Sequence, residues 1–149
     1  MFTIEKTISW EMGHRLSLHQ GKCYNIHGHS YRTTITFGSP SLDANGMVID
    51  FYHFAKVKEF IDNNWDHALM LNIDDPLKDF LTVKGNLTRG LKYAIVPGEP
   101  SAENMARWLC EIASKLLAEF TLGKDRQILS VTVEETATSA ATFVPEVVN

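Results

Sequence analysis

Residues 2–12 alternate between apolar and polar side chains with a period of two. The odd positions carry Thr, Ser and Glu, and the even positions are apolar except for Lys6: Phe2, Ile4, Ile8, Trp10 and Met12. This alternation is typical of a β-strand with one buried and one exposed face. The chain is therefore predicted to begin with a half-buried strand, and His14 has the same parity as its buried positions.

Three later segments also carry strand signals. Residues 29–37 alternate and are rich in β-branched and aromatic side chains, with Tyr31, Ile35 and Phe37 on one face. Residues 129–133 alternate in the same way, and the apolar end of the chain predicts a last strand over 142–148. Strands are thus expected toward both ends of the chain.

Two helices are predicted in the middle of the chain. Asp50 is a suitable N-cap for a helix over 51–64, and Ser101 for a longer one that ends near Phe120, where apolar residues recur at helical spacing. Residues 72–100 lie between them, contain several prolines and glycines, and show no sustained period. We expect this long excursion to hold no more than a short turn or two.

The order of two strands, two helices and two strands predicts an α+β fold. In this fold a four-stranded antiparallel sheet carries both helices on one face. The length of 149 residues is that of one domain, so residues 1–149 are expected to form a single unit.

Composition narrows the class of protein further. Lys and Arg total 14 and Asp and Glu total 18, a net charge of -4, and no basic run is present, so nucleic acid is an unexpected partner. The 2 cysteines are too few for a disulfide scaffold and fit a reducing compartment. Because no apolar run is long enough for a transmembrane helix, we expect a soluble, cytoplasmic protein with no membrane partner.

Three histidines share the buried parity of the first two strands. On an extended backbone His27 and His29 project from one face with Tyr31, and His14 belongs to the buried face of the first strand. Three neutral imidazoles from adjacent strands form a tetrahedral zinc site with one open position, as catalytic zinc sites do. Taken alone, the His-x-His pair could equally be two unrelated polar residues near a strand end.

Cys23 lies on a polar loop shortly before the paired histidines. A free thiol has a pKa of about 8.5, which a nearby metal ion lowers, so Cys23 is a candidate base. The alternative for a lone cysteine is a small buried apolar side chain, which is our interpretation of Cys110 on the second helix. Asp66 and His67 could form a carboxylate-supported imidazole, although neighbours in sequence seldom face each other.

Glu135 continues the row of Leu129, Val131 and Val133 at the end of the third strand, whereas Glu134 belongs to the other face. A carboxylate on the buried side is costly unless it is paired. Glu135 is therefore predicted to anchor a ligand or to take part in a buried ion pair.

These residues, in this order, resemble the 6-pyruvoyltetrahydropterin synthase family, and specifically its bacterial 6-carboxytetrahydropterin synthase branch, which serves queuosine biosynthesis. The matching motifs cover most of the chain: His14, Gly21-Lys22-Cys23, His27-Gly28-His29, Gly46-Met47-Val48-Ile49-Asp50-Phe51, Asp66-His67, Pro100-Ser101-Ala102-Glu103-Asn104 and Glu135-Thr136. The short spacer between Cys23 and His27 is similar to the carboxy branch.

The resemblance implies the tunnelling fold, in which trimers close a barrel and two trimers stack into a homohexamer. It implies a small-molecule pterin triphosphate, 7,8-dihydroneopterin triphosphate, as substrate, with Zn2+ held by His14, His27 and His29. Cys23 would accept the proton, and Asp66 and His67 would form a relay from a neighbouring subunit. The residues implied to bind substrate are Ser101, Glu103, Glu135 and Thr136. Side-chain cleavage would release acetaldehyde and triphosphate and leave 6-carboxy-5,6,7,8-tetrahydropterin.

The chain departs from the family pattern at several places. Trp10 and Met12 stand where Phe and Ala are more frequent, Ser101 replaces a usual Thr, and residues 73–98 exceed the minimal family length. Two other functions therefore stay open: a pyruvoyl synthase that eliminates triphosphate, and a zinc- or pterin-binding protein without turnover.

Overall fold

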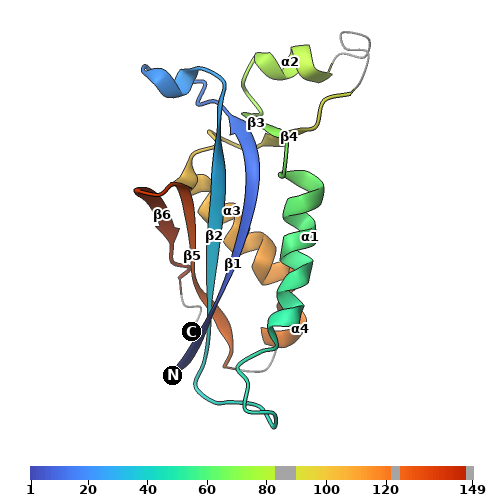
Figure 1. Cartoon of the computed structure of the whole chain (residues 1–149), viewed down its shortest axis with the longest axis vertical. Coiled ribbons are helices and arrows are strands. Elements are labelled where there is room, and N and C mark those ends of the chain that lie inside the picture. Colours follow the sequence, from blue (N-terminus) through green and yellow to red (C-terminus); the bar gives the residue numbers. More distant parts are fainter. Residues whose placement is uncertain (83–89, 122–124, 147–149) are drawn as a thin grey trace.

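A computed structural model of the chain describes residues 1–82, 90–121 and 125–146. Two long strands run the length of the molecule, two helices cover one face of the sheet, and a short helix lies at one end (Figure 1). Within these described residues the sheet has six strands in the order β4-β3-β1-β2-β5-β6.

The central hairpin has the alternation that the sequence predicts. β1 (Phe2–His14) pairs with β2 (His27–Ser39) in one unbroken antiparallel register. The buried positions of β1 are the even ones from Ile8 to His14, and β2 buries its odd positions from Tyr31 to Phe37. A single apolar face of the hairpin therefore continues into a histidine-bearing end.

β5 (Gln127–Thr136) extends this sheet on the other side of β2 and is itself paired with β6 (Ser139–Phe143). The β2–β5 register shifts between Thr36 and Phe37, so that Phe37 lies opposite Ile128. The prediction of a last strand over 142–148 is wrong in its boundaries, because the chain turns directly after Thr136 and pairs back from Ser139. Residues 147–149 lie outside the described part of the chain.

The helices lie where the sequence places them. A 3-10 turn (Phe51–Phe54) leads into α1 (Ala55–Asn64), and Asp50 caps it by accepting from the Tyr52 N–H. α3 (Ala102–Leu116) begins after the Ser101 cap and is followed by the short α4 (Ala118–Thr121). Buried side chains of both long helices form one cluster with the sheet: Val57, Ile61, Met105, Leu109, Ile8, Trp10, Ile35 and Phe37.

The prediction of a four-stranded antiparallel sheet is wrong, because two more strands lie between α1 and α3. The first ends where the excursion begins, and the second lies inside the excursion, which therefore holds a strand and a helix rather than only a short turn or two. β3 (Leu69–Asn72) runs parallel to β1, and β4 (Tyr93–Val96) runs parallel to β3. α2 (Leu77–Thr82) lies between them in sequence. Met70 and Leu71 of β3 are fully buried, as residues of parallel strands usually are. Strands of four residues are too short to show a period, which explains why the sequence did not indicate them.

Within the described residues, no helix is long and apolar enough to cross a membrane.

Candidate metal and substrate site

The end of the central hairpin brings three imidazoles together. His14 ends β1 and lies opposite His27, the first residue of β2, and His29 follows on the same face. Each ring offers one nitrogen, and these three nitrogens lie within 4.8 Å of one another. Ring centroids are 4.5 Å apart for His14 and His27, 5.2 Å for His14 and His29, and 5.1 Å for His27 and His29.

Backbone carbonyl groups orient two of the three rings. His14 Nδ1 lies 2.7 Å from the carbonyl oxygen of Pro100, and His27 Nδ1 lies 2.7 Å from that of Asn25. Since a carbonyl oxygen can only accept, each Nδ1 carries the proton, and each Nε2 keeps a free lone pair. Burial lowers the pKa of His14 to about 4, although the hydrogen bond to the Pro100 carbonyl raises it. This imidazole is therefore neutral at pH 7.

This donor set fits a zinc ion. The Nε2 atoms of His14 and His27 are 3.1 Å apart, and with both Nδ1 atoms protonated their lone pairs face each other. Tetrahedral zinc with nitrogen ligands at 2.0–2.1 Å spaces those ligands at roughly 3.3 Å, close to the spacing seen here. A cation between the lone pairs turns their repulsion into two bonds. Three neutral nitrogen ligands leave one coordination position open.

Glu135 lies beside this cluster. Its Oε1 is 3.9 Å from His14 Nε2, and a quarter of its side chain is exposed. Burial raises the pKa of Glu135, while His29 opposes that rise and Glu103 adds to it. The neighbouring Glu134 points to the other face, where it accepts hydrogen bonds from Arg32. The structure thus separates the two acids as their parity in the sequence predicts.

Tyr31 completes the buried wall of the site. It is fully buried, its ring lies edge-on to His14 and His29 at 5.8 and 5.4 Å, and it stacks on Trp10 at 5.3 Å. Burial, with Glu135 and Cys23 adding to it, raises the pKa of Tyr31 far above its ordinary value. Its hydroxyl has no hydrogen-bond partner among the described residues.

Cys23 lies in a 3-10 turn (Lys22–Tyr24) on the loop that joins β1 to β2. Its thiol is free and partly buried, whereas the thiol of Cys110 is buried on α3. The sulfur is near enough to Tyr31 to contribute to the raised pKa of its hydroxyl. It is not part of the group of three imidazole nitrogens that lie within 4.8 Å of one another. That the Cys23 thiol lies directly beside the histidine cluster therefore stays a prediction; the structure places its loop between the two strands that carry the cluster.

Asp66 and His67 lie at the edge of β1, outside the three-histidine cluster. Asp66 accepts from the Glu11 N–H at 2.9 Å and contacts His67 Nδ1 at 2.8 Å, so these sequence neighbours do face each other. His67 has a positive φ of 57°, a conformation that costs energy in most residues and often marks functional positions. Its side chain is 75% exposed, and it lines a groove of about 410 Å³ that also includes Glu11 and His29.

The remaining predicted substrate residues lie at the start of α3 and at the end of β5. Ser101 caps α3 by accepting from the Asn104 N–H, and Glu103 is exposed in the first turn of that helix. Glu103 is near enough to Glu135 to raise its pKa. Thr136 ends β5 and is exposed, with its hydroxyl 3.4 Å from that of Thr138.

Sequence reasoning missed the groups that orient the cluster. The carbonyl oxygens of Pro100 and Asn25 belong to the backbone and have no residue signature, although Pro100 directly precedes a helix cap. Alternation in the sequence predicts that Tyr31 is buried, but not that its ring contacts His14 and His29.

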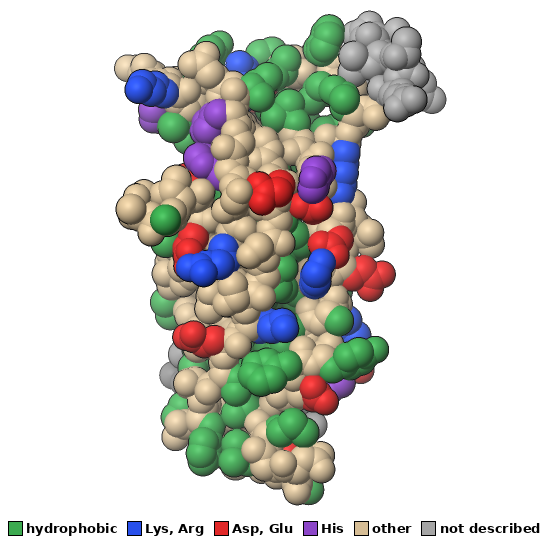
Figure 2. All heavy atoms as spheres, in the orientation of Figure 1, with side chains coloured by type: hydrophobic (Ala, Val, Ile, Leu, Met, Phe, Trp, Pro, Cys, Tyr) green, Lys and Arg blue, Asp and Glu red, His purple; other side chains and the backbone are tan. Residues whose placement is uncertain are grey.

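Histidine side chains gather on the upper part of the face shown in Figure 2, with acidic and basic side chains below them.

The fold is that of known tetrahydropterin synthases. The structure superposes on an uncharacterized protein from Wolinella succinogenes with a TM-score of 0.84 and 25% identity, covering 97% of this chain and 98% of the other. It superposes on 6-pyruvoyl tetrahydropterin synthase from Caenorhabditis elegans with a TM-score of 0.66 and 24% identity over 97% of this chain and 96% of that one. The α+β fold of this chain is thus shared with a tetrahydropterin synthase.

The sequence comparisons define the family. Residues 3–146 match the family model of 6-pyruvoyl tetrahydropterin synthase. A 6-carboxy-5,6,7,8-tetrahydropterin synthase from Aquifex aeolicus is 32% identical over 96% of this chain and 98% of its own length. A protein of the same name from Rickettsia felis is 39% identical over 73% of this chain and 78% of its own length. The chain belongs to the 6-pyruvoyl tetrahydropterin synthase family, which confirms the resemblance seen in its motifs.

Proposed function

We propose that this protein is a zinc-dependent 6-carboxy-5,6,7,8-tetrahydropterin synthase. It would convert 7,8-dihydroneopterin triphosphate and water to 6-carboxytetrahydropterin, acetaldehyde and triphosphate. The single observation that carries this proposal is the convergence of His14, His27 and His29 at one end of the sheet, with the Glu135 carboxylate beside them. The names of the Aquifex and Rickettsia relatives support the choice of reaction.

His14 and His27 would hold the zinc ion through their Nε2 atoms, and His29 through one of its ring nitrogens. When bound, zinc polarises oxygen atoms of the substrate side chain and stabilises negative charge that develops on them. The carbonyl groups of Pro100 and Asn25 keep two of the imidazoles in the tautomer that this role requires.

The chain's own residues would bind the pterin and move protons. The Glu135 carboxylate is partly buried, so it would form strong hydrogen bonds with the N–H groups of the pterin's amino-pyrimidine edge. Ser101 and Glu103 at the start of α3 and Thr136 at the end of β5 are further proposed substrate contacts. Cys23, as the thiolate, would take a proton from a carbon of the substrate side chain and become the thiol, because it is a free cysteine on the loop between His14 and His27.

Asp66 and His67 would serve the site of a neighbouring copy. The carboxylate contacts Nδ1 of His67 at 2.8 Å, which would leave Nε2 as the exchanging nitrogen. The exposure of His67 at the edge of the sheet supports a role outside its own chain. This is consistent with an assembly of several copies, and we propose the homohexamer of two stacked trimers that the family resemblance implies.

We further propose, from the same resemblance, that the enzyme acts in the cytoplasm in queuosine biosynthesis.

A pyruvoyl synthase is the second candidate, favoured by the name of the matching family model. Both reactions would begin with proton movements on the same side chain, but only the carboxy reaction breaks a carbon–carbon bond. A binding protein without turnover is the third candidate, and the free thiol on the site loop argues against it.

Product analysis separates these candidates. The purified, zinc-loaded protein is incubated with dihydroneopterin triphosphate, and the products are identified by mass spectrometry. We expect 6-carboxytetrahydropterin and acetaldehyde in equal amounts. A pyruvoyl pterin as end product would select the second candidate, and unchanged substrate would select the third. Cys23→Ala should abolish turnover and keep the zinc, whereas Cys110→Ala serves as the control thiol variant.

A further inference from the structure

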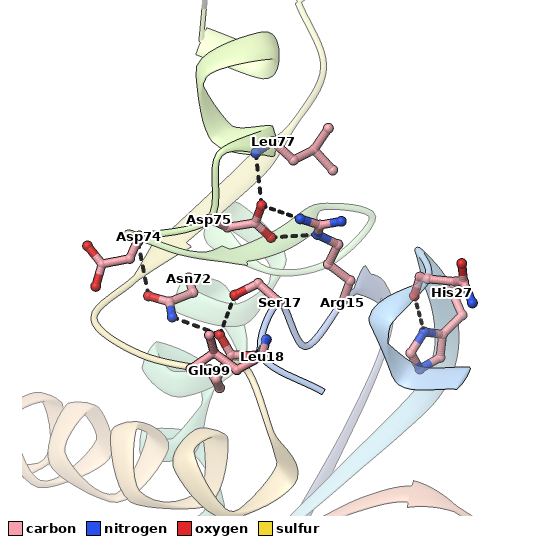
Figure 3. Close-up of polar contacts among 10 residues, drawn as sticks. Arg15, Ser17, Leu18, His27, Asn72, Asp74, Asp75, Leu77 and Glu99 are labelled. Atoms are coloured by element: carbon pink, nitrogen blue, oxygen red, sulfur yellow. Dashed lines mark hydrogen bonds and ion pairs between the residues drawn. The ribbon is translucent and has the colours of Figure 1, made fainter. Parts of the chain in front are cut away.

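The loop that carries Cys23 is bound by polar contacts to the excursion between α1 and α3. We call residues 15–26 the cysteine loop. Two acidic residues of the excursion, Asp75 and Glu99, accept hydrogen bonds from its beginning, as Figure 3 shows. The catalytic roles proposed above use neither acid, and no sequence pattern assigns a role to the excursion.

Arg15 and Asp75 form a two-pronged ion pair. Nε of Arg15 lies 2.6 Å from Oδ2 of Asp75, and Nη2 lies 2.7 Å from Oδ1. Asp75 is fully buried, and the Arg15 side chain is only 13% exposed. Oδ1 of Asp75 also accepts from the Leu77 N–H at 2.8 Å, which fixes the carboxylate to the start of α2. Such a fork defines both the position and the plane of the guanidinium group.

Arg15 also contacts the 3-10 turn that carries Cys23. Its guanidinium carbon lies 4.8 Å from the centre of the Tyr24 ring, within the range of a cation–π contact. Tyr24 follows Cys23 in the 3-10 turn, and the Leu16 N–H donates to the Cys23 carbonyl at 2.8 Å. Arg15 therefore contacts the side chain that follows Cys23, and its neighbour Leu16 holds the Cys23 backbone.

Glu99 ties the same loop to the histidine cluster. Its carboxylate accepts from the Ser17 hydroxyl at 2.6 Å, from the Leu18 N–H at 3.4 Å and from Asn72 Nδ2 at 2.8 Å. The next residue, Pro100, provides the carbonyl group that orients His14. One segment of the excursion therefore contacts both the cysteine loop and a proposed zinc ligand.

We propose that Arg15 and Asp75 are positioning residues that fix the Cys23 thiol relative to the histidine cluster, with the excursion as their anchor. This inference rests on the proposed function for its kinetic consequence, because thiol placement matters only if Cys23 moves a proton. Its structural consequence, a restrained thiol, does not depend on the reaction. Small displacements of a reacting group are costly: about 1 Å can reduce a rate about 100-fold.

Arg15→Lys keeps the charge and removes the fork, and Asp75→Asn keeps the shape and removes the charge. Tyr24→Leu removes the ring contact without disturbing a buried group, so it keeps the test valid if Asp75→Asn fails to fold. Arg32→Lys is the control, because Arg32 also donates two hydrogen bonds to a carboxylate away from the loop: its Nε and Nη2 lie 2.9 and 2.6 Å from Oε2 of Glu134.

Two measurements decide the proposal. The first is the rate at which iodoacetamide alkylates Cys23 in metal-free, folded protein, followed by peptide mass spectrometry. The second is kcat and KM of the zinc-loaded protein. For Arg15→Lys we expect alkylation at least about threefold faster, kcat at least about tenfold lower, unchanged KM and unchanged zinc content. Tyr24→Leu should shift alkylation in the same direction, and Arg32→Lys should leave every value within about twofold.

Alkylation rates and kcat of the Arg15 and Tyr24 variants that match those of Arg32→Lys would overturn the proposal. A purely structural role would lower the free energy of unfolding and leave the thiol of the folded molecules as it was. If the wild-type protein shows no turnover, the proposed function is wrong, and the alkylation rates still decide whether the ion pair restrains Cys23.

Discussion

His14 donates through Nδ1 to the carbonyl oxygen of Pro100 at 2.7 Å, across 86 positions of sequence. The contact joins the end of β1 to the residue before the α3 cap, and it leaves Nε2 of His14 facing His27. The same carbonyl therefore links the sheet, the helix and the proposed metal site.

Removal of one imidazole should remove the metal. His27→Ala takes away a ligand whose ring is already oriented by the Asn25 carbonyl, so we expect zinc content to fall at least about tenfold from one per chain. Elemental analysis after dialysis measures it. His53→Ala is the control, because His53 stacks on Phe120 rather than in the cluster. Equal zinc contents in the two variants would contradict the assignment.

The two neighbouring glutamates should differ sharply. Glu135→Gln removes the charged acceptor proposed to bind the pterin edge, and hydrogen bonds to a charged group contribute about 1.5–3 kcal/mol. We therefore expect kcat/KM to fall about 10–100-fold. Glu134→Gln loses only the contact with Arg32 and should stay within about twofold. Steady-state kinetics of both variants tests this, and a larger loss in Glu134→Gln would reverse the proposed roles.

Acid should destabilise the metal-free protein through His14. Burial lowers its pKa from 6.5 to about 4, so the unfolded chain binds a proton that the folded chain refuses. The stability that the neutral ring provides is complete above pH 6.5 and is lost progressively as pH falls to about 4. The loss should reach about 3 kcal/mol.

Urea unfolding of the metal-free protein between pH 7.5 and 4 measures this loss. The raised pKa of Glu135 acts in the opposite sense, adding stability at low pH, so the comparison is with His14→Gln rather than with an absolute value. The variant should lack the extra acid sensitivity. Parallel pH profiles of the two proteins would show that His14 is not the responsible group.

The proposed sharing of residues between subunits predicts complementation. Cys23→Ala and His67→Ala should each be inactive, but co-expressed chains that mix at random should form sites with both wild-type residues. A site needs an intact Cys23 from one copy and an intact His67 from its neighbour, so about one quarter of the sites should be active. Activity of the tagged, mixed assembly measures this fraction. Absence of recovery in assemblies shown to be mixed would place both residues in the same chain's site.

Much of the site follows from side-chain alternation. The parity of His14, His27 and His29 predicts their common face, because the β1–β2 pairing is regular over its whole length. The separation of Glu134 and Glu135 follows in the same way. Local patterns are sufficient here because each side chain is directed by its own strand.

The rest depends on contacts that no local pattern encodes. β3 and β4 are short and gain their place from parallel pairing beside β1, and the β2–β5 register shift near Phe37 buries Ile128 where alternation favours Leu129. The support of the cysteine loop by Asp75 and Glu99 joins residues far apart in sequence.

The zinc-edge X-ray absorption spectrum of the purified protein tests the central claim most directly. Three imidazole ligands and one open position predict nitrogen or oxygen scatterers at roughly 2.0–2.1 Å and imidazole multiple-scattering features that weaken in His27→Ala. A sulfur shell at about 2.3 Å would make Cys23 a ligand instead of a base, and a protein that takes up no zinc would contradict the site altogether.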